Sequence, residues 1–108
     1  SLPSPLAHVK VAVFPLMKKY VLPEKAIAII DELKFDFNCQ YEEKDNIGKR
    51  YRRQDAIGTP FCLTVDHQSL EDNTVTIRDR DTMKQDRVAI ADLTNIIGNK
   101  VDLRTLLA

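Results

Sequence analysis

Residues 8–16, HVKVAVFPL, constrain the fold of this 108-residue chain more than any other stretch. Valine occupies every second position, as expected of a β-strand whose successive side chains point to opposite faces. Ala12 and Phe14 make the intervening face partly apolar as well. A strand that is apolar on both faces must be covered on both sides, and Pro15 ends it. The segment therefore predicts a sheet that lies between two layers of helices.

The next segments predict a strand–helix–strand unit. Pro23 and Glu24 are typical of a first helical turn, and apolar residues at helical spacing extend this pattern over residues 23–35. Residues 37–43 again alternate and indicate a second strand. A strand, a helix and a strand in this order favour a right-handed parallel crossover.

The remainder of the chain predicts one more helix, three strands and a helical end. A helix capped by Asp45 or Asn46 is expected to end at Gly58. The further expected elements are strands at 60–67, 74–80 and 84–90, a polar turn at 70–73, a short helix closed by Gly98 and a final turn capped by Asp102. The short links around 74–80 favour antiparallel neighbours. The predicted fold class is α/β, with a mixed five-stranded sheet and the order βαβαβββα.

Catalytic and metal patterns are missing from the sequence. Cys39 and Cys62 form no CxxC pair, and no histidine follows at zinc-ligand spacing, so buried thiols in a reducing compartment are expected. Cys62 and His67 would point to opposite faces of a strand, which does not assemble a nucleophile and base. Three scattered glycines cannot build a phosphate-binding loop. No apolar run is long enough to cross a membrane.

Positive charge is concentrated in residues 47–58, although the chain carries 16 basic and 16 acidic residues. The window contains Lys49, Arg50, Arg52 and Arg53 against Asp55 alone. At a step of 100° per residue, these four residues fall within an arc of about 160°, while Ile47 and Tyr51 face the other way. The pattern predicts a contiguous basic stripe that binds a polyanion. A solvated or internally paired helix face remains the alternative.

Residues 78–81, Arg-Asp-Arg-Asp, form a second candidate site, with Gln85 close behind. Arginine donates paired hydrogen bonds and stacks on bases, whereas aspartate accepts a hydrogen bond from the cytosine amine. Recognition of single-stranded RNA uses this combination. Cross-strand salt bridges are the alternative. Phe61 or Tyr51 could supply a stacking surface, or could belong to the core.

Two long strings closely resemble the C-terminal anticodon-binding domain of glycyl-tRNA synthetases of the dimeric bacterial type. They are DNIGKRYRRQDAIGTPF at 45–61, followed by LTVD at 63–66, and NTVTIRDRDTMKQDR at 73–87. The similarity extends from about residue 5 to residue 97. It implies the three-layer α/β/α anticodon-binding fold of class II synthetases over residues 8–108. The proline-rich start of the chain indicates, independently of the resemblance, the end of an interdomain linker at residues 1–7.

The resemblance also implies a function. It implies that the chain is a non-catalytic part of a cytoplasmic, homodimeric glycine–tRNA ligase, whose separate catalytic domain uses ATP and Mg²⁺. The fragment itself is expected to be monomeric, to bind no cofactor and to hold the anticodon of tRNA(Gly). Glycine anticodons carry two adjacent cytosines, which Asp79 or Asp81 and Arg78 or Arg80 would read, while Arg50 and Arg53 would hold phosphates or stack on a base. The full set of expected RNA-binding residues is Lys49, Arg50, Arg53, Phe61, Arg78, Asp79, Arg80, Asp81 and Gln85.

Three other functions stay open at this point. The domain could belong to a prolyl-, threonyl- or histidyl-type synthetase, or to a polymerase accessory subunit with the same fold. It could instead be a docking domain whose basic helix meets an acidic protein, or a small enzyme, although it lacks an assembled catalytic group.

Overall fold

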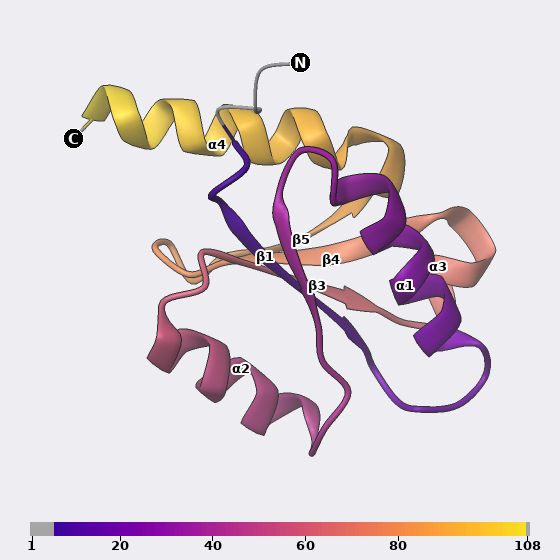
Figure 1. Cartoon of the computed structure of the whole chain (residues 1–108). Helices are drawn as coiled ribbons and strands as arrows, with labels where there is room; N and C mark the ends of the chain where they lie inside the picture. Colours follow the sequence, from indigo (N-terminus) through magenta and orange to yellow (C-terminus); the bar gives the residue numbers. More distant parts are fainter. Residues whose placement is uncertain (1–5, 108) are drawn as a thin grey trace.

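The computed structural model describes the backbone of residues 6–107 and the side chains of residues 6–102. Its elements follow one another in the order β1 (Lys10–Pro15), α1 (Leu22–Leu33), β2 (Asn38–Tyr41), α2 (Ile47–Ile57), β3 (Phe61–Val65), α3 (His67–Asp72), β4 (Thr74–Asp79), β5 (Gln85–Ala89), a 3₁₀ turn η1 (Ile90–Asp92) and α4 (Leu93–Leu107). Figure 1 shows α2 on one side of the sheet and α1, α3 and α4 on the other. The predicted three-layer fold is confirmed.

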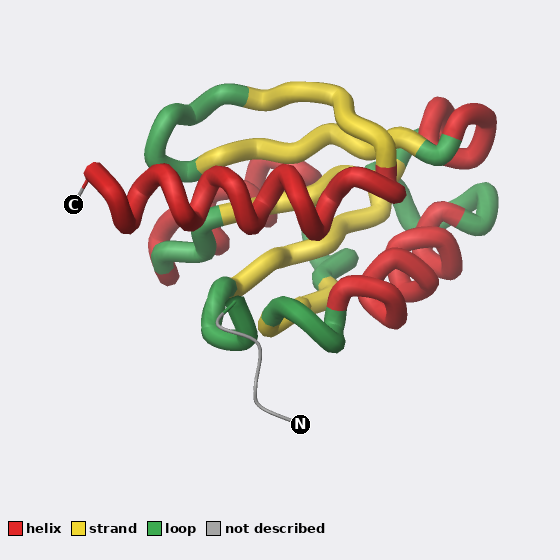
Figure 2. The backbone as a smooth tube through the Cα atoms, turned by 90° about the horizontal axis from the view of Figure 1, so that it is seen from above, coloured by secondary structure: helices red, strands yellow, loops and turns green. Residues whose placement is uncertain are grey.

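The five strands form one mixed sheet with the order β2-β1-β3-β4-β5. β1 pairs in parallel with β2 and β3, whereas β3–β4 and β4–β5 are antiparallel. Both the predicted parallel crossover and the predicted antiparallel neighbours are therefore confirmed. Figure 2 shows α4 crossing above the sheet. Because β1, β2 and β3 run in parallel, the loops after β1 and β2 leave from the same edge of the sheet as the start of α3.

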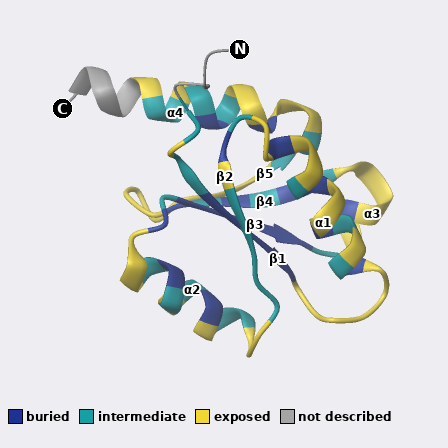
Figure 3. Cartoon of the chain, in the orientation of Figure 1, coloured by how far each residue is buried: buried dark blue, intermediate teal, exposed yellow. Residues whose placement is uncertain are grey.

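The two faces of the sheet hold cores of very different size. Val11, Val13 and alternate residues of the other strands pack against α1 and α4 in the main core. On the other face, Ala12, Phe14 and Cys62 form a small cluster that packs against α2. Figure 3 shows the central strand β3 buried from end to end, while the outer side of α2 is exposed. Residues of β1 are apolar on both faces because one face packs in the main core and the other packs beneath α2.

Residues 67–72 form the helix α3, where a polar turn was predicted at 70–73. Asp66 caps this helix: its carboxylate accepts from the Ser69 backbone amide at 3.1 Å, and the Ser69 hydroxyl accepts from the Asp66 amide at 3.0 Å. Asn73 closes the helix in the left-handed conformation, with a φ of 56°. These caps make a short helix out of a polar segment.

The predicted stop at Gly98 and the predicted cap at Asp102 are both wrong, because α4 continues from Leu93 to Leu107. A Cβ at position 98 would lie 3.5 Å from the Leu6 side chain, an ordinary van der Waals distance, so the N-terminal segment passes close to the helix at this residue. Leu6 packs against the main core. The side chains of Leu103, Leu106 and Leu107, and residues 1–5 of the predicted linker, lie outside the described part.

Candidate nucleic-acid interface

The helix α2 does not present the predicted stripe of four basic residues. Lys49 and Arg52 are exposed and Arg53 is half-buried, but Arg50 is only 2% exposed. Arg50 stands three residues after Ile47 and one before Tyr51, which places it on the face that packs on the sheet. The prediction of a contiguous stripe is therefore wrong at Arg50, whose long side chain reaches inward.

Arg50 fastens α2 to the ends of two strands. Its guanidinium donates to the Pro15 carbonyl oxygen at 2.6 Å, and to those of Leu16 and Glu42 at 3.5 Å each. It also lies over the Phe14 ring, with its Cζ atom 5.7 Å from the ring centroid. Burial lowers the pKa of Arg50 below its ordinary value, although a guanidinium stays charged at neutral pH. Arg50 thus has a structural role.

Arg53 is the most heavily paired residue of the exposed side of α2. It forms a salt bridge with Glu42, donates to the Asp45 carboxylate at 3.1 Å and donates to the Lys44 carbonyl oxygen at 3.1 Å. Hydrogen bonding to Asp45 raises the pKa of Arg53. Glu42 also accepts from Gln54 at 2.7 Å. These bonds fix the orientation of the Arg53 side chain, which remains 39% exposed.

Arg78 connects β4 to α2. Its two terminal nitrogens donate to the two carboxylate oxygens of Asp55 at 2.7 and 3.0 Å. The guanidinium also lies over the Tyr51 ring, 5.1 Å from its centroid, and 13% of the side chain is exposed. A bidentate pair that is stacked on an aromatic ring holds the arginine in one position. Arg78 is therefore paired internally, but with a residue of the helix α2 and not, as the alternative interpretation of residues 78–81 expected, across the strands.

The charged residues at the turn between β4 and β5 differ in exposure and in their hydrogen bonds. Asp79 is 4% exposed, and its carboxylate accepts from the backbone amides of Asp81 at 2.9 Å and Thr82 at 3.4 Å. Arg80 and Asp81 are exposed, and Arg80 Nε donates to the Asp55 carbonyl oxygen at 3.2 Å. Asp79 therefore shapes the turn that presents Arg80 and Asp81 to solvent.

Gln85 is exposed on the edge strand β5 and is the register partner of Arg78. Directly opposed residues of an antiparallel pair point to the same face, so Gln85 lies on the α2 side of the sheet. Phe61 has no exposed surface and packs in the main core, so we assign it a core role. Tyr51, the other candidate for stacking, is half-buried between Phe14 and Arg78.

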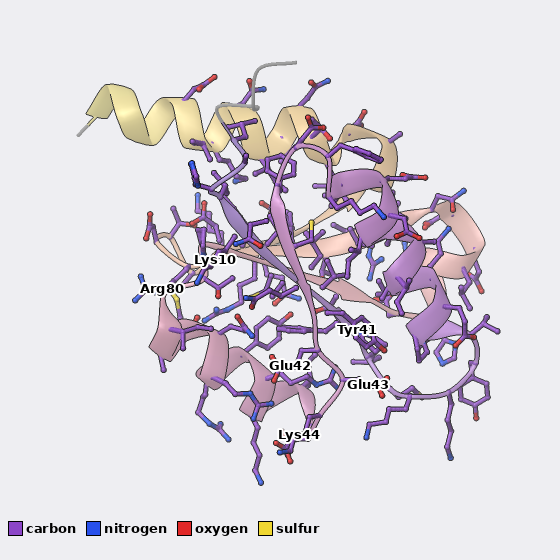
Figure 4. All side chains as sticks on the ribbon, viewed as in Figure 1. Lys10, Tyr41, Glu42, Glu43, Lys44 and Arg80 are labelled. Atoms are coloured by element: carbon purple, nitrogen blue, oxygen red, sulfur yellow. The ribbon has the colours of Figure 1, made fainter. Side chains whose placement is uncertain are left out.

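The structure brings the exposed members of the predicted set together along α2. Figure 4 shows Arg80 beside one end of this helix and Lys44 beside the other. The surface that we call the α2 face comprises Lys44, Lys49, Arg52, Arg53, Arg80, Asp81 and Gln85. Arg52 and Lys44 were missing from the expected RNA-binding residues. The basic stripe predicted from the sequence did include Arg52, whereas Lys44 precedes the helix and lies outside that stripe.

The pairing of Asp55 with Arg78 predicts a pH dependence of stability. The pKa of Asp55 lies below its ordinary value because hydrogen bonds from Arg78 outweigh the effect of burial. A lowered pKa contributes stability above the ordinary aspartate value of about 4, which is lost as the pH falls through the folded-state value. We expect the free energy of unfolding to decrease below about pH 4, and to decrease less steeply in Asp55→Asn.

Urea unfolding at three pH values between neutral and about 2 measures this effect. The exposed Asp31, which pairs only with its helix neighbour Lys34, provides the control variant Asp31→Asn. Equal pH slopes for Asp55→Asn and the unaltered chain would show that the Arg78 pair does not stabilise the fold.

The described residues contain neither a cluster of potential metal ligands nor a helix that could span a membrane. No group of three or more histidine, cysteine or acidic residues within residues 6–102 is placed to hold a metal ion. Among the described helices, none is both long and apolar enough to cross a membrane. Burial raises the pKa of the Cys39 thiol to about 11 and that of the Cys62 thiol to about 12. Both thiols therefore stay protonated at neutral pH, the unreactive form of a cysteine.

Comparison with known proteins identifies relatives that match nearly the whole chain. Glycine–tRNA ligases from Clostridium kluyveri, Lachnospira eligens and Rhodopirellula baltica are 52%, 56% and 52% identical to it over 96, 95 and 100 residues. The alignments cover 89%, 88% and 93% of this chain but only 20%, 20% and 19% of the relatives. The chain thus spans about one fifth of the length of these proteins.

A solved structure and a family model agree with these relatives. The RNA binding domain of threonyl-tRNA synthetase from Cryptosporidium parvum Iowa II superposes with a TM-score of 0.74 at 22% identity, which covers 83% of this chain and 23% of that chain and shows a shared fold. The model of the family described as "Anticodon binding domain" matches residues 10–100. The chain that carries the α2 face is therefore a member of the anticodon binding domain family.

Proposed function

We propose that this chain binds the anticodon loop of tRNA(Gly) through the α2 face. The observation that carries the proposal is the 52–56% identity to glycine–tRNA ligases over about nine tenths of the chain. The exposed basic residues along α2 support it, because RNA affinity depends largely on contacts with phosphates. The chain spans about one fifth of the length of those relatives. We therefore propose glycine attachment, with ATP and Mg²⁺, for a longer protein whose catalytic domain lies outside this chain. That protein is proposed to be cytoplasmic and homodimeric.

The geometry favours different RNA contacts for the two parts of the α2 face, the helix and the turn after β4. Lys49, Arg52 and Arg53 point outward from the helix and are assigned to phosphates. Arg80 and Asp81 stand on the exposed turn after β4, where they offer donors and an acceptor to a cytosine edge. Asp79 accepts hydrogen bonds from backbone amides of this turn, so we assign the cytosine amine to Asp81 and not to Asp79.

Fluorescence anisotropy with a labelled stem-loop RNA tests the proposal. One RNA carries a glycine anticodon, and a matched RNA has both anticodon cytosines replaced. We expect the unaltered chain to bind the first RNA more tightly, by roughly tenfold or more for one well-formed base contact. Equal binding of both RNAs would contradict the assignment of glycine anticodon recognition.

The variant Arg80→Ala is expected to lose most of this discrimination, because its guanidinium is the exposed donor group of the turn. Arg52→Ala is the matched control, because it removes another exposed arginine, from the middle of the helix. We expect it to weaken binding of both RNAs alike and to reduce the slope of log affinity against log salt concentration by about one. An Arg80→Ala variant that still prefers the cytosine RNA to the full extent would remove Arg80 from base recognition.

A further inference from the structure

The loop between β1 and α1, residues 16–21, holds two consecutive non-glycine residues in the left-handed backbone region. Tyr20 has a φ of 62° and Val21 a φ of 56°. This region is uncommon for any side chain and is a genuine outlier for a β-branched residue such as valine. Backbone of this kind clusters at ligand-binding positions, which gives a reason to ask what the loop presents.

The loop presents an aromatic ring to solvent instead of burying it. Tyr20 is 62% exposed and Val21 is 58% exposed. One neighbour supports the tyrosine ring: the imidazole of His67, the first residue of α3, with a centroid distance of 5.1 Å and an interplanar angle of 57°. A large, mostly exposed ring that is braced on a second ring is the kind of surface on which an unpaired base stacks.

The charge of this loop favours a nucleic acid as its ligand. Lys18 and Lys19 directly precede Tyr20, and both are exposed. Residues 16–21 contain no acidic side chain. A cationic segment next to an exposed aromatic ring is the combination that binds single-stranded nucleic acid, with lysines on phosphates and the ring on a base.

The start of the loop is hydrogen-bonded to the first turn of α2, on the buried inner side of that helix. Arg50 of α2 donates to the carbonyl oxygens of Pro15 and Leu16, where the loop begins. Leu16 in addition donates its amide to the Val65 carbonyl oxygen at 2.8 Å. In Figure 1 the loop after β1 and the start of α2 lie at the same edge of the sheet. An RNA that extends beyond the first turn of α2 would therefore approach this loop.

From these observations we infer that Tyr20, braced by His67 and flanked by Lys18 and Lys19, is a stacking contact for an RNA nucleotide outside the anticodon triplet. The inference rests on the proposed function. Arg80 contacts the C-terminal end of α2, whereas the loop is fastened to its first turns. The 11-residue helix is about 16 Å long, while three stacked bases rise only about 10 Å. Tyr20 therefore contributes affinity without cytosine preference.

The test measures the affinity of this chain for the two stem-loop RNAs described above. Tyr20→Ala is expected to weaken binding of both RNAs by about tenfold and to leave their ratio unchanged, since stacking is insensitive to sequence. Tyr20→Phe keeps the ring and is expected to stay within about twofold of the unaltered chain. Phe35→Ala removes an aromatic ring that is 78% exposed at the end of α1, and serves as the matched control with unchanged affinity.

A second measurement reports on stacking directly. The fluorescent base 2-aminopurine is placed in turn at each loop nucleotide outside the triplet, and its quenching on binding is recorded. At one position we expect quenching that persists with Tyr20→Phe and disappears with Tyr20→Ala.

Each outcome decides one question. Unchanged affinity and quenching in Tyr20→Ala, while the unaltered chain binds RNA, overturn this inference alone. Failure of the unaltered chain to bind either RNA overturns the proposed function and this inference together. A loss of affinity in Phe35→Ala as large as that in Tyr20→Ala would show a general effect of surface aromatic residues and would also overturn the inference.

Discussion

Phe14→Ala is expected to lower the free energy of unfolding by about 3–5 kcal/mol, the range for large-to-small changes in a packed core. Phe14 is fully buried and is the largest member of the small cluster beneath α2. The Tyr51 ring packs edge-on against it, with centroids 5.5 Å apart, and the Arg50 guanidinium lies above it. Because this cluster is small, its loss weakens the attachment of α2 more than that of the other helices.

Urea unfolding followed by circular dichroism measures the overall effect, and hydrogen exchange measures where it falls. We expect the amides of α2 to lose more protection than those of α1. Phe35→Ala is again the control, because the same side chain is removed from a position that is 78% exposed, and its stability should stay within about 0.5 kcal/mol of the unaltered chain. Equal destabilisation by the two variants would contradict the role given to the Phe14 cluster.

Arg50→Leu is expected to lower the free energy of unfolding by about 3 kcal/mol, because three backbone carbonyl groups lose a charged donor. Leucine keeps an apolar stem in the same space, so the lost hydrogen bonds dominate the result. Arg50→Lys keeps the charge but offers one ammonium in place of the planar fork, and an intermediate loss is expected.

Arg52→Leu provides the comparison for Arg50→Leu, since it makes the same change two residues further along, at an exposed position. Its stability should change by no more than about 0.5 kcal/mol, while its RNA affinity falls. Arg50→Leu should bind RNA as well as the unaltered chain under conditions where it is folded. The opposite pattern would return Arg50 to the RNA-binding surface and withdraw its structural role.

The sequence was a good guide wherever apolar periodicity decided the structure. The alternation around Ala12 and Phe14 predicted a sheet covered on both faces, and the structure has helices on both. Caps and long polar side chains were harder to interpret. The helix α3 depends on the reciprocal bonds of Asp66 and Ser69, which override a polar composition. Gly98 is accommodated inside α4, next to Leu6, so it does not end that helix.

In the candidate site, the sequence likewise did not predict which individual charged side chains are buried. The sequence indicated which segments carry arginine and aspartate, but not which of these side chains face inward. Arg50 and Asp79 belong to charged strings, yet each is buried with hydrogen bonds to backbone groups. Burial of a charged group depends on the polar partners that tertiary contacts supply, and here those partners come from β1, β2 and the turn after β4.

The unequal cores on the two faces of the sheet have a consequence for how such a domain can diversify. The main core, with α1 and α4, fixes the fold, whereas α2 is attached through three buried apolar side chains and a few polar bonds. Substitutions on the outer side of α2 and on the turn after β4 can change the charge and hydrogen-bonding groups of this surface without disturbing the packing that keeps the domain folded. Under the proposed function, one scaffold can therefore present different recognition surfaces, and the α2 face is the place to engineer an altered RNA specificity.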